Sequence, residues 1–138
     1  MAIQAKRVVG GGLVAGLVIC ASAALMVPVV GDEMAAAQAA LGVPPMGPGA
    51  MAFFFAFSLA LGLLVVWLYA ALLPRFGPGP RTALLVAVLL WFLTSFSSSA
   101  ANLAYGFMPL GLTVVGMVWG LAELVVAALV GTRLYREA

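Results

Sequence analysis

Charged residues are scarce in this sequence, and histidine is absent. Only 7% of its 138 residues are charged, with six Lys or Arg and four Asp or Glu. In a soluble domain of average composition about a quarter of the residues are charged. The polar surface that would have to face water on all sides is therefore missing. This excludes a soluble globular domain and predicts an integral membrane protein.

The shortage of reactive and metal-ligating groups excludes further classes of site. A single cysteine, Cys20, cannot form an internal disulfide, and without histidine the usual imidazole ligands of haem, zinc and copper are missing. We expect no cofactor and no metal site, and we interpret Cys20 as a small buried hydrophobe. The sequence also has no phosphate-binding glycine loop, Ser-His-Asp set or Cys-His pair. We therefore expect no enzyme.

Apolar residues make up most of the chain. They account for 66% of it, and the mean hydropathy is +1.25. A helix that crosses a bilayer needs roughly 20 such residues, and four runs reach that length, each bounded by Pro, Gly or charge. This predicts an all-α integral membrane protein with four transmembrane helices in an antiparallel bundle, forming one membrane domain over 1–138. The predicted spans are 8–30, 50–73, 82–103 and 110–131.

The positions of the cations predict the orientation. Two precede the first span, two lie between the second and third spans, and two follow the fourth, so all six fall on one side. By the positive-inside rule both termini are cytoplasmic. Pairs at span ends do not form the basic patch that nucleic acid requires, so no nucleic-acid partner is expected. The six cations are Lys6, Arg7, Arg75, Arg81, Arg133 and Arg136.

The external loop, 31–49, is the longest predicted connection. Asp32 and Glu33 followed by an alanine-rich stretch predict a short capped helix that stops at Gly42, before the proline-rich turn VPPMGPG. The beginning of the chain also has features of a signal peptide, with the small trio Ala21, Ser22 and Ala23 as a cleavage site. The apolar run continues past this trio, which favours a membrane span.

Glu123 is the one ionisable side chain deep in a predicted span. An acidic residue at the centre of a span costs roughly 2.5–3.5 kcal/mol, so it should face protein or water. No Lys or Arg lies at its depth, which leaves protonation, hydrogen bonding or a partner chain. Trp91 and Thr94 of the third span lie at a compatible depth and are its predicted partners. An interhelical latch, a latch to another subunit and a proton or cation relay remain open.

Other small and polar residues predict helix contacts. Ser95 belongs to a hydroxyl-rich stretch of the third span that suits interhelical packing, a hydrophilic vestibule or a subunit contact. Gly116 and Gly120 share a helix face with Glu123, and Gly12 and Gly16 repeat the same GxxxG spacing in the first span. Glycines at this spacing allow two membrane helices to approach closely. These four glycines are the predicted helix-packing residues.

Several longer strings add a resemblance. The external LGVPP, the turn PRFGPGPRTA and the last span VWGLAELVVAALVGTRLYRE, together with the glycine-rich first span, resemble small four-span bacterial inner-membrane proteins of uncharacterised function. The resemblance covers nearly the whole chain. It implies a four-helix fold in the bacterial inner membrane, cytoplasmic or intracytoplasmic, and implies no activity.

Two functional hypotheses follow. The first is a non-catalytic accessory subunit that packs its small-residue faces and Glu123 against a larger membrane complex, for example a respiratory or photosynthetic one. Its partners would be membrane lipids and other membrane subunits, because helix-packing features are what the sequence has in excess. The second is a small homo-oligomeric transporter or channel that uses Glu123 in a polar path.

Overall fold

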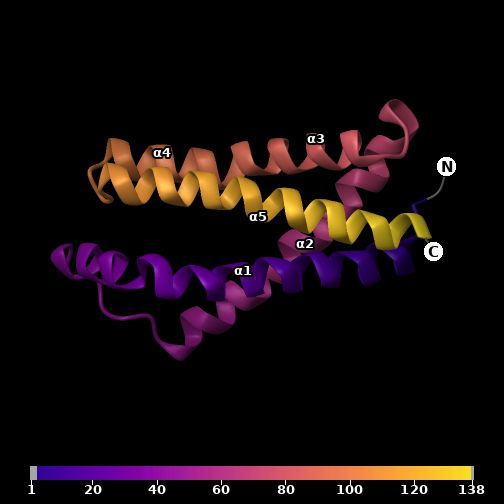
Figure 1. Cartoon of the computed structure of the whole chain (residues 1–138). Helices are drawn as coiled ribbons and strands as arrows, with labels where there is room; N and C mark the ends of the chain where they lie inside the picture. The colour runs from indigo at the N-terminus through magenta and orange to yellow at the C-terminus, as the bar shows by residue number, and fades with distance from the viewer. Residues whose placement is uncertain (1–2, 138) are drawn as a thin grey trace.

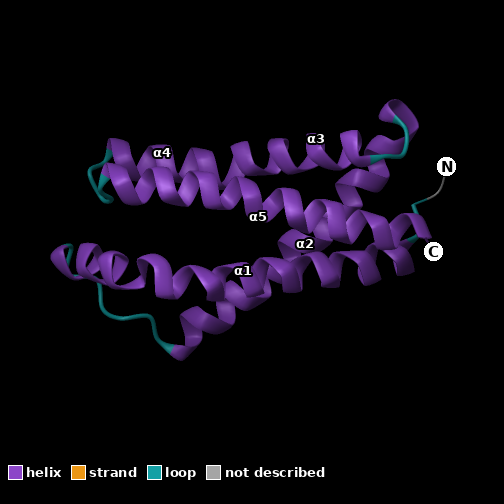
Figure 2. Ribbon diagram, in the orientation of Figure 1, coloured by secondary structure: helices purple, strands orange, loops and turns teal. Residues whose placement is uncertain are grey.

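The protein is a four-helix structure with no strand among the described residues. A computed structural model describes residues 3–137, with side chains up to 135 (Figure 1). Helices account for nearly all of this part, joined by short loops (Figure 2). In chain order the elements are α1 (Ala5–Ala40), α2 (Pro48–Phe76), α3 (Pro80–Trp91), the π-helical turn η1 (Phe92–Phe96), α4 (Ser97–Ala104) and α5 (Leu110–Glu137).

Four helices are long and apolar enough to cross a membrane. The third of them combines α3, η1 and α4 into one stretch, Pro80–Ala104. The others are Ala5–Ala40, Pro48–Phe76 and Leu110–Tyr135. The start of α1, the end of α5 and the turn between α2 and α3 lie at the same end of the molecule (Figure 1).

The first helix is longer than the sequence predicted. It continues through Pro28 to Ala40 as one helix of 36 residues, about 54 Å at 1.5 Å per residue. The prediction of a separate short helix after Asp32 is therefore wrong, because this stretch is the last part of α1. Pro28 removes one backbone hydrogen bond and its ring crowds the preceding turn, at a cost of about 3 kcal/mol. The helix nevertheless continues through it into an alanine-rich stretch, and alanine has the highest helix propensity.

Two of the helices end at a glycine with the same pair of hydrogen bonds, and one of these stops, Gly42, was predicted. Gly42 has φ +71°, the Gly42 N–H donates to the Ala39 carbonyl, and the Val43 N–H donates to the Gln38 carbonyl. This is the Schellman arrangement, which needs a left-handed residue just past the helix. Gly106, with φ +74°, ends α4 with the same pair of hydrogen bonds.

The π-helical turn interrupts the third span. Around η1, hydroxyl side chains add hydrogen bonds to backbone carbonyls of their own helix. The Ser97 hydroxyl donates to the Phe92 carbonyl at 2.6 Å, and the Thr94 hydroxyl donates to the Leu90 carbonyl at 2.6 Å. The hydroxyl-rich stretch thus satisfies the backbone of its own helix at little cost.

The core occupies the half of the molecule that contains the start of α1 and the end of α5. There α1 packs against α2 and α5, and α3 packs against α5 and α2, so α5 lies between α1 and α3 (Figure 1). The largest fully buried side chains come from α2, α3 and α5. They are Tyr69, Leu124, Val65, Val66 and Val86.

Five glycines bring three helices into backbone contact; we call them the glycine junction. A Cβ added at Gly62 of α2 would collide with the backbone of Gly12 and Gly16, lying 2.6 Å from the Gly16 Cα. On the neighbouring face of α1, a Cβ at Gly131 of α5 would lie 2.9 Å from the carbonyl oxygen of Gly11. Any side chain in this junction would force the helices apart.

We expect Gly62→Ala to destabilise the protein by about 1–3 kcal/mol, because its new methyl group overlaps the α1 backbone and overpacking costs that much. Gly116→Ala is the matched control, since nothing lies within 4 Å of a Cβ at Gly116. That variant should be neutral or stabilising by up to about 1 kcal/mol through helix propensity. Denaturant unfolding in detergent micelles measures both. Equal effects of the two variants would contradict the close approach of α1 and α2.

Candidate functional site

Glu123 points from α5 toward α1, where it meets Ser22. The Ser22 hydroxyl lies near the Glu123 carboxyl and can donate a hydrogen bond to it. The same Ser22 hydroxyl accepts a hydrogen bond from the Trp119 indole Nε1 at 2.8 Å. Trp119 and Glu123 are four residues apart on α5 and so share one helix face. We call Ser22, Trp119 and Glu123 the intramembrane polar cluster.

The hydrogen-bonding capacity of Ser22 fits both partners at once. A serine hydroxyl has one proton to donate and two lone pairs that accept. Because the indole N–H occupies a lone pair, the hydroxyl proton remains free to go to the carboxyl oxygen of Glu123. All three side chains are partly buried. In this cluster a carboxyl group within a predicted span therefore has a hydrogen-bond donor close by on a second helix.

The third span does not supply the partners of Glu123. The Trp91 indole Nε1 donates to the Met117 carbonyl at 2.8 Å, and the Thr94 hydroxyl donates within its own helix. Trp91 therefore ties α3 to the α5 backbone, while Glu123 is tied to α1. The reason is the position of α5 between α1 and α3, so that different sides of α5 face different helices.

The four predicted packing glycines have different surroundings. Gly12 and Gly16 lie in the glycine junction. Gly120 lies against Ser95, whose hydroxyl oxygen would be 2.7 Å from a Cβ added there. Gly116 has open space at this position. Of these two α5 glycines, only Gly120 lies close to the third span, where Ser95 acts as a small packing residue.

Sequence reasoning missed Ser22 and Trp119 as site residues. Ser22 stood out only as part of a small-residue trio, and Trp119 was not singled out. A usable sign was present, since Trp119 lies four residues before the only acidic residue of its span. Ser22 carried no such sign, because its distance of 97 positions from Trp119 becomes a contact only when α1 packs against α5.

The cluster offers little chemistry beyond hydrogen bonding. Among the described residues no group of three or more His, Cys, Asp or Glu could hold a metal ion. Comparisons with protein-family models, with curated proteins and with solved structures found no match for this chain. The geometry alone therefore carries the functional argument. One carboxyl, one hydroxyl and one indole form a latch between α1 and α5.

A double-mutant cycle tests the latch. We expect Trp119→Phe and Ser22→Ala to be coupled by about 0.5–1.5 kcal/mol, because each removes the same interhelical hydrogen bond and such bonds in membranes have that range. Unfolding in detergent micelles gives the four free energies. Trp91→Phe combined with Ser22→Ala is the control and should be additive, since the Trp91 indole donates to Met117. Additivity of the first pair would contradict the latch.

Proposed function

We propose that this chain is a non-catalytic accessory subunit that packs against a larger complex in a bacterial inner membrane, respiratory or photosynthetic for example. The observation that carries the proposal is the uncovered first part of α2. All residues from 50 to 57 are exposed. Successive residues of a helix point about 100° apart, so no side of this segment is covered by another part of the described chain.

The exposed segment is rich in large apolar side chains. Phe53, Phe54, Phe55 and Phe57 are between 49% and 63% exposed. At Ser58, α2 still lies against Gly16 of α1. From Ser58 back toward its N-terminus, α2 leads away from the other helices (Figure 1). A membrane protein whose own core ends halfway along a span has that surface free for lipid or for another subunit.

Small residues on the same segment favour a helix as the neighbour. Ala52, Ala56 and Ala60 are exposed and follow each other at intervals of four, so they form one stripe along α2. Association of helices in lipid depends on close backbone approach at such small residues. Within the chain, helices approach closely in this way at the glycine junction. We call Ala52, Ala56 and Ala60 the alanine stripe, and a helix of a partner could approach closely along it.

The surroundings of Glu123 support a structural role for this residue. Ser22 of the same chain lies near its carboxyl and can donate a hydrogen bond to it. A relay needs a series of titratable groups, and no other Asp, Glu, Lys or Arg lies between residues 82 and 132. The alternative, a homo-oligomeric transporter or channel, would require the latch to open onto a polar path.

The distribution of charge supports an antiparallel bundle with both termini in the cytoplasm. Arg75 and Arg81 flank the turn between α2 and α3, at the end where α1 starts and α5 finishes. Asp32 and Glu33 lie in the distal part of α1, away from that end. This separation fits the positive-inside rule.

Native electrophoresis of mild-detergent extracts, followed by mass spectrometry of the bands, tests the accessory role. We expect the chain to co-migrate with subunits of one complex. Ala56→Trp should abolish this co-migration, because a large side chain prevents close approach along the stripe. Ala122→Trp, an equal change at an exposed position of α5, should leave it intact.

Migration alone or as a homo-oligomer would refute the accessory role. Flux across proteoliposomes then becomes the informative measurement, with Glu123→Gln as the variant. A transporter that uses the carboxyl would lose its flux. For a latch the same substitution is mild, since the amide oxygen still accepts a hydrogen bond from Ser22.

A further inference from the structure

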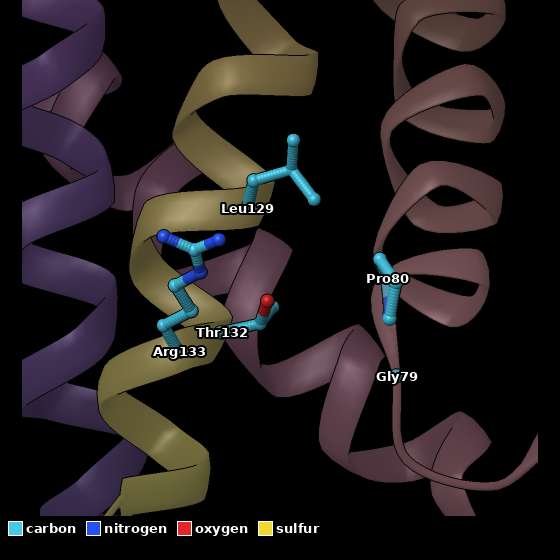
Figure 3. A pocket seen from close by; sticks show the side chains of 5 residues that line it. All are labelled: Gly79, Pro80, Leu129, Thr132 and Arg133. Carbon is cyan, nitrogen blue, oxygen red and sulfur yellow. The ribbon is translucent and has the colours of Figure 1, made fainter.

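A hollow of about 110 Å³ lies between the beginning of α3 and the end of α5. Its lining combines backbone and apolar surface with one cation: Gly79 and Pro80 from one side, and Leu129, Thr132 and Arg133 from the other. Figure 3 shows Leu129 and Thr132 projecting from α5 toward the start of α3, while the Arg133 side chain runs up along α5. A single water needs only roughly 10–15 Å³, so a larger group fits here.

Hydrogen bonds hold the walls of the hollow in place. The Gly79 N–H donates to the hydroxyl of Tyr69, a fully buried side chain, at 3.1 Å. The Thr82 hydroxyl donates to the Gly77 carbonyl at 2.7 Å, which fixes the turn before α3. On the opposite wall the Thr132 hydroxyl donates to the Ala128 carbonyl at 2.6 Å. The hollow is therefore formed before any ligand arrives.

The charges of the described side chains around the hollow favour an anion. Arg133 lines the hollow. Arg75 is in the last turn of α2 and Arg81 in the first turn of α3, and these two helix ends lie at the same end of the molecule (Figure 1). The carboxylates whose side chains the structure describes lie elsewhere, two in the distal part of α1 and one in the polar cluster with Ser22. A guanidinium offers five donors in a planar fork that matches phosphate oxygens.

We propose that this hollow binds the phosphate of an anionic phospholipid headgroup. The phosphate would contact the Arg133 guanidinium, while Leu129 and Pro80 provide apolar surface for the glycerol and the first acyl carbons. Basic pockets between membrane helices on the cytoplasmic side are suited to such headgroups. This combination of one cation and apolar walls distinguishes a lipid from free inorganic phosphate, which has no apolar part. The proposal is independent of any protein partner.

Native mass spectrometry of the purified full chain with added phosphatidylglycerol or phosphatidylcholine tests the proposal. Wild-type protein should retain phosphatidylglycerol preferentially, and Arg133→Gln should weaken this binding roughly fivefold, about 1 kcal/mol for one cation at an anionic lipid. Arg75→Gln is the matched control, because it makes the same change of charge at the same end outside the hollow. It should keep most of the binding.

A second variant tests the cavity itself. Leu129→Phe fills the space without changing the charge and should weaken phosphatidylglycerol binding while leaving Arg133 present. Equal losses in Arg75→Gln and Arg133→Gln would show general attraction to the basic end and would overturn the proposed site. Displacement of phosphatidylglycerol by inorganic phosphate at equal concentration would show that the hollow binds free phosphate, and would overturn the lipid as the source of the bound phosphate. Unchanged binding in both Arg133→Gln and Leu129→Phe would overturn the site altogether.

Discussion

Backbone contact at the glycine junction is the constraint on which the rest of this structure depends. In lipid no hydrophobic force drives helices together, so association rests on close packing and interhelical hydrogen bonds. Because Gly62 has no side chain, the backbone of Gly12 and Gly16 lies directly against it. The backbone of Gly131 lies against Gly11 in the same way. Because α1 presents both of these faces, it fixes α2 and α5 at once, and the buried core forms around this contact.

The polar cluster depends on the same approach. Ser22 lies about 1.7 turns beyond Gly16 on α1, so the helix position fixed by the junction brings its hydroxyl to Trp119 and Glu123. The cost of placing a carboxyl within a span is offset by a donor from the neighbouring helix. Along the α1–α5 contact, close backbone packing thus brings the polar side chains together, and their hydrogen bonding in turn stabilises the packing.

The two ends of the molecule differ in what they leave open. At the end with the cations, α2, α3 and α5 enclose buried side chains and a small hollow beside Arg133. At the other end α2 extends uncovered, with phenylalanines around it and an alanine stripe along it. A chain that is well packed in one half and open in the other is suited to docking through the open half, which is the physical basis of the proposed accessory role.

The sequence by itself determined the class of structure, because apolar runs of sufficient length and a shortage of charge leave only membrane helices. It also identified the helix stop at Gly42, where a left-handed residue was required, and drew attention to Glu123 because it is an acidic residue in an apolar run. Only the tertiary structure decided that Ser22, and not Trp91 or Thr94, is the side chain that can donate to Glu123. It also decided that Gly120 lies against Ser95, while a Cβ at Gly116 would meet open space. Local composition and spacing govern helix formation, whereas these pairings depend on which helices become neighbours, and residues 97 positions apart in sequence carry no local sign of that.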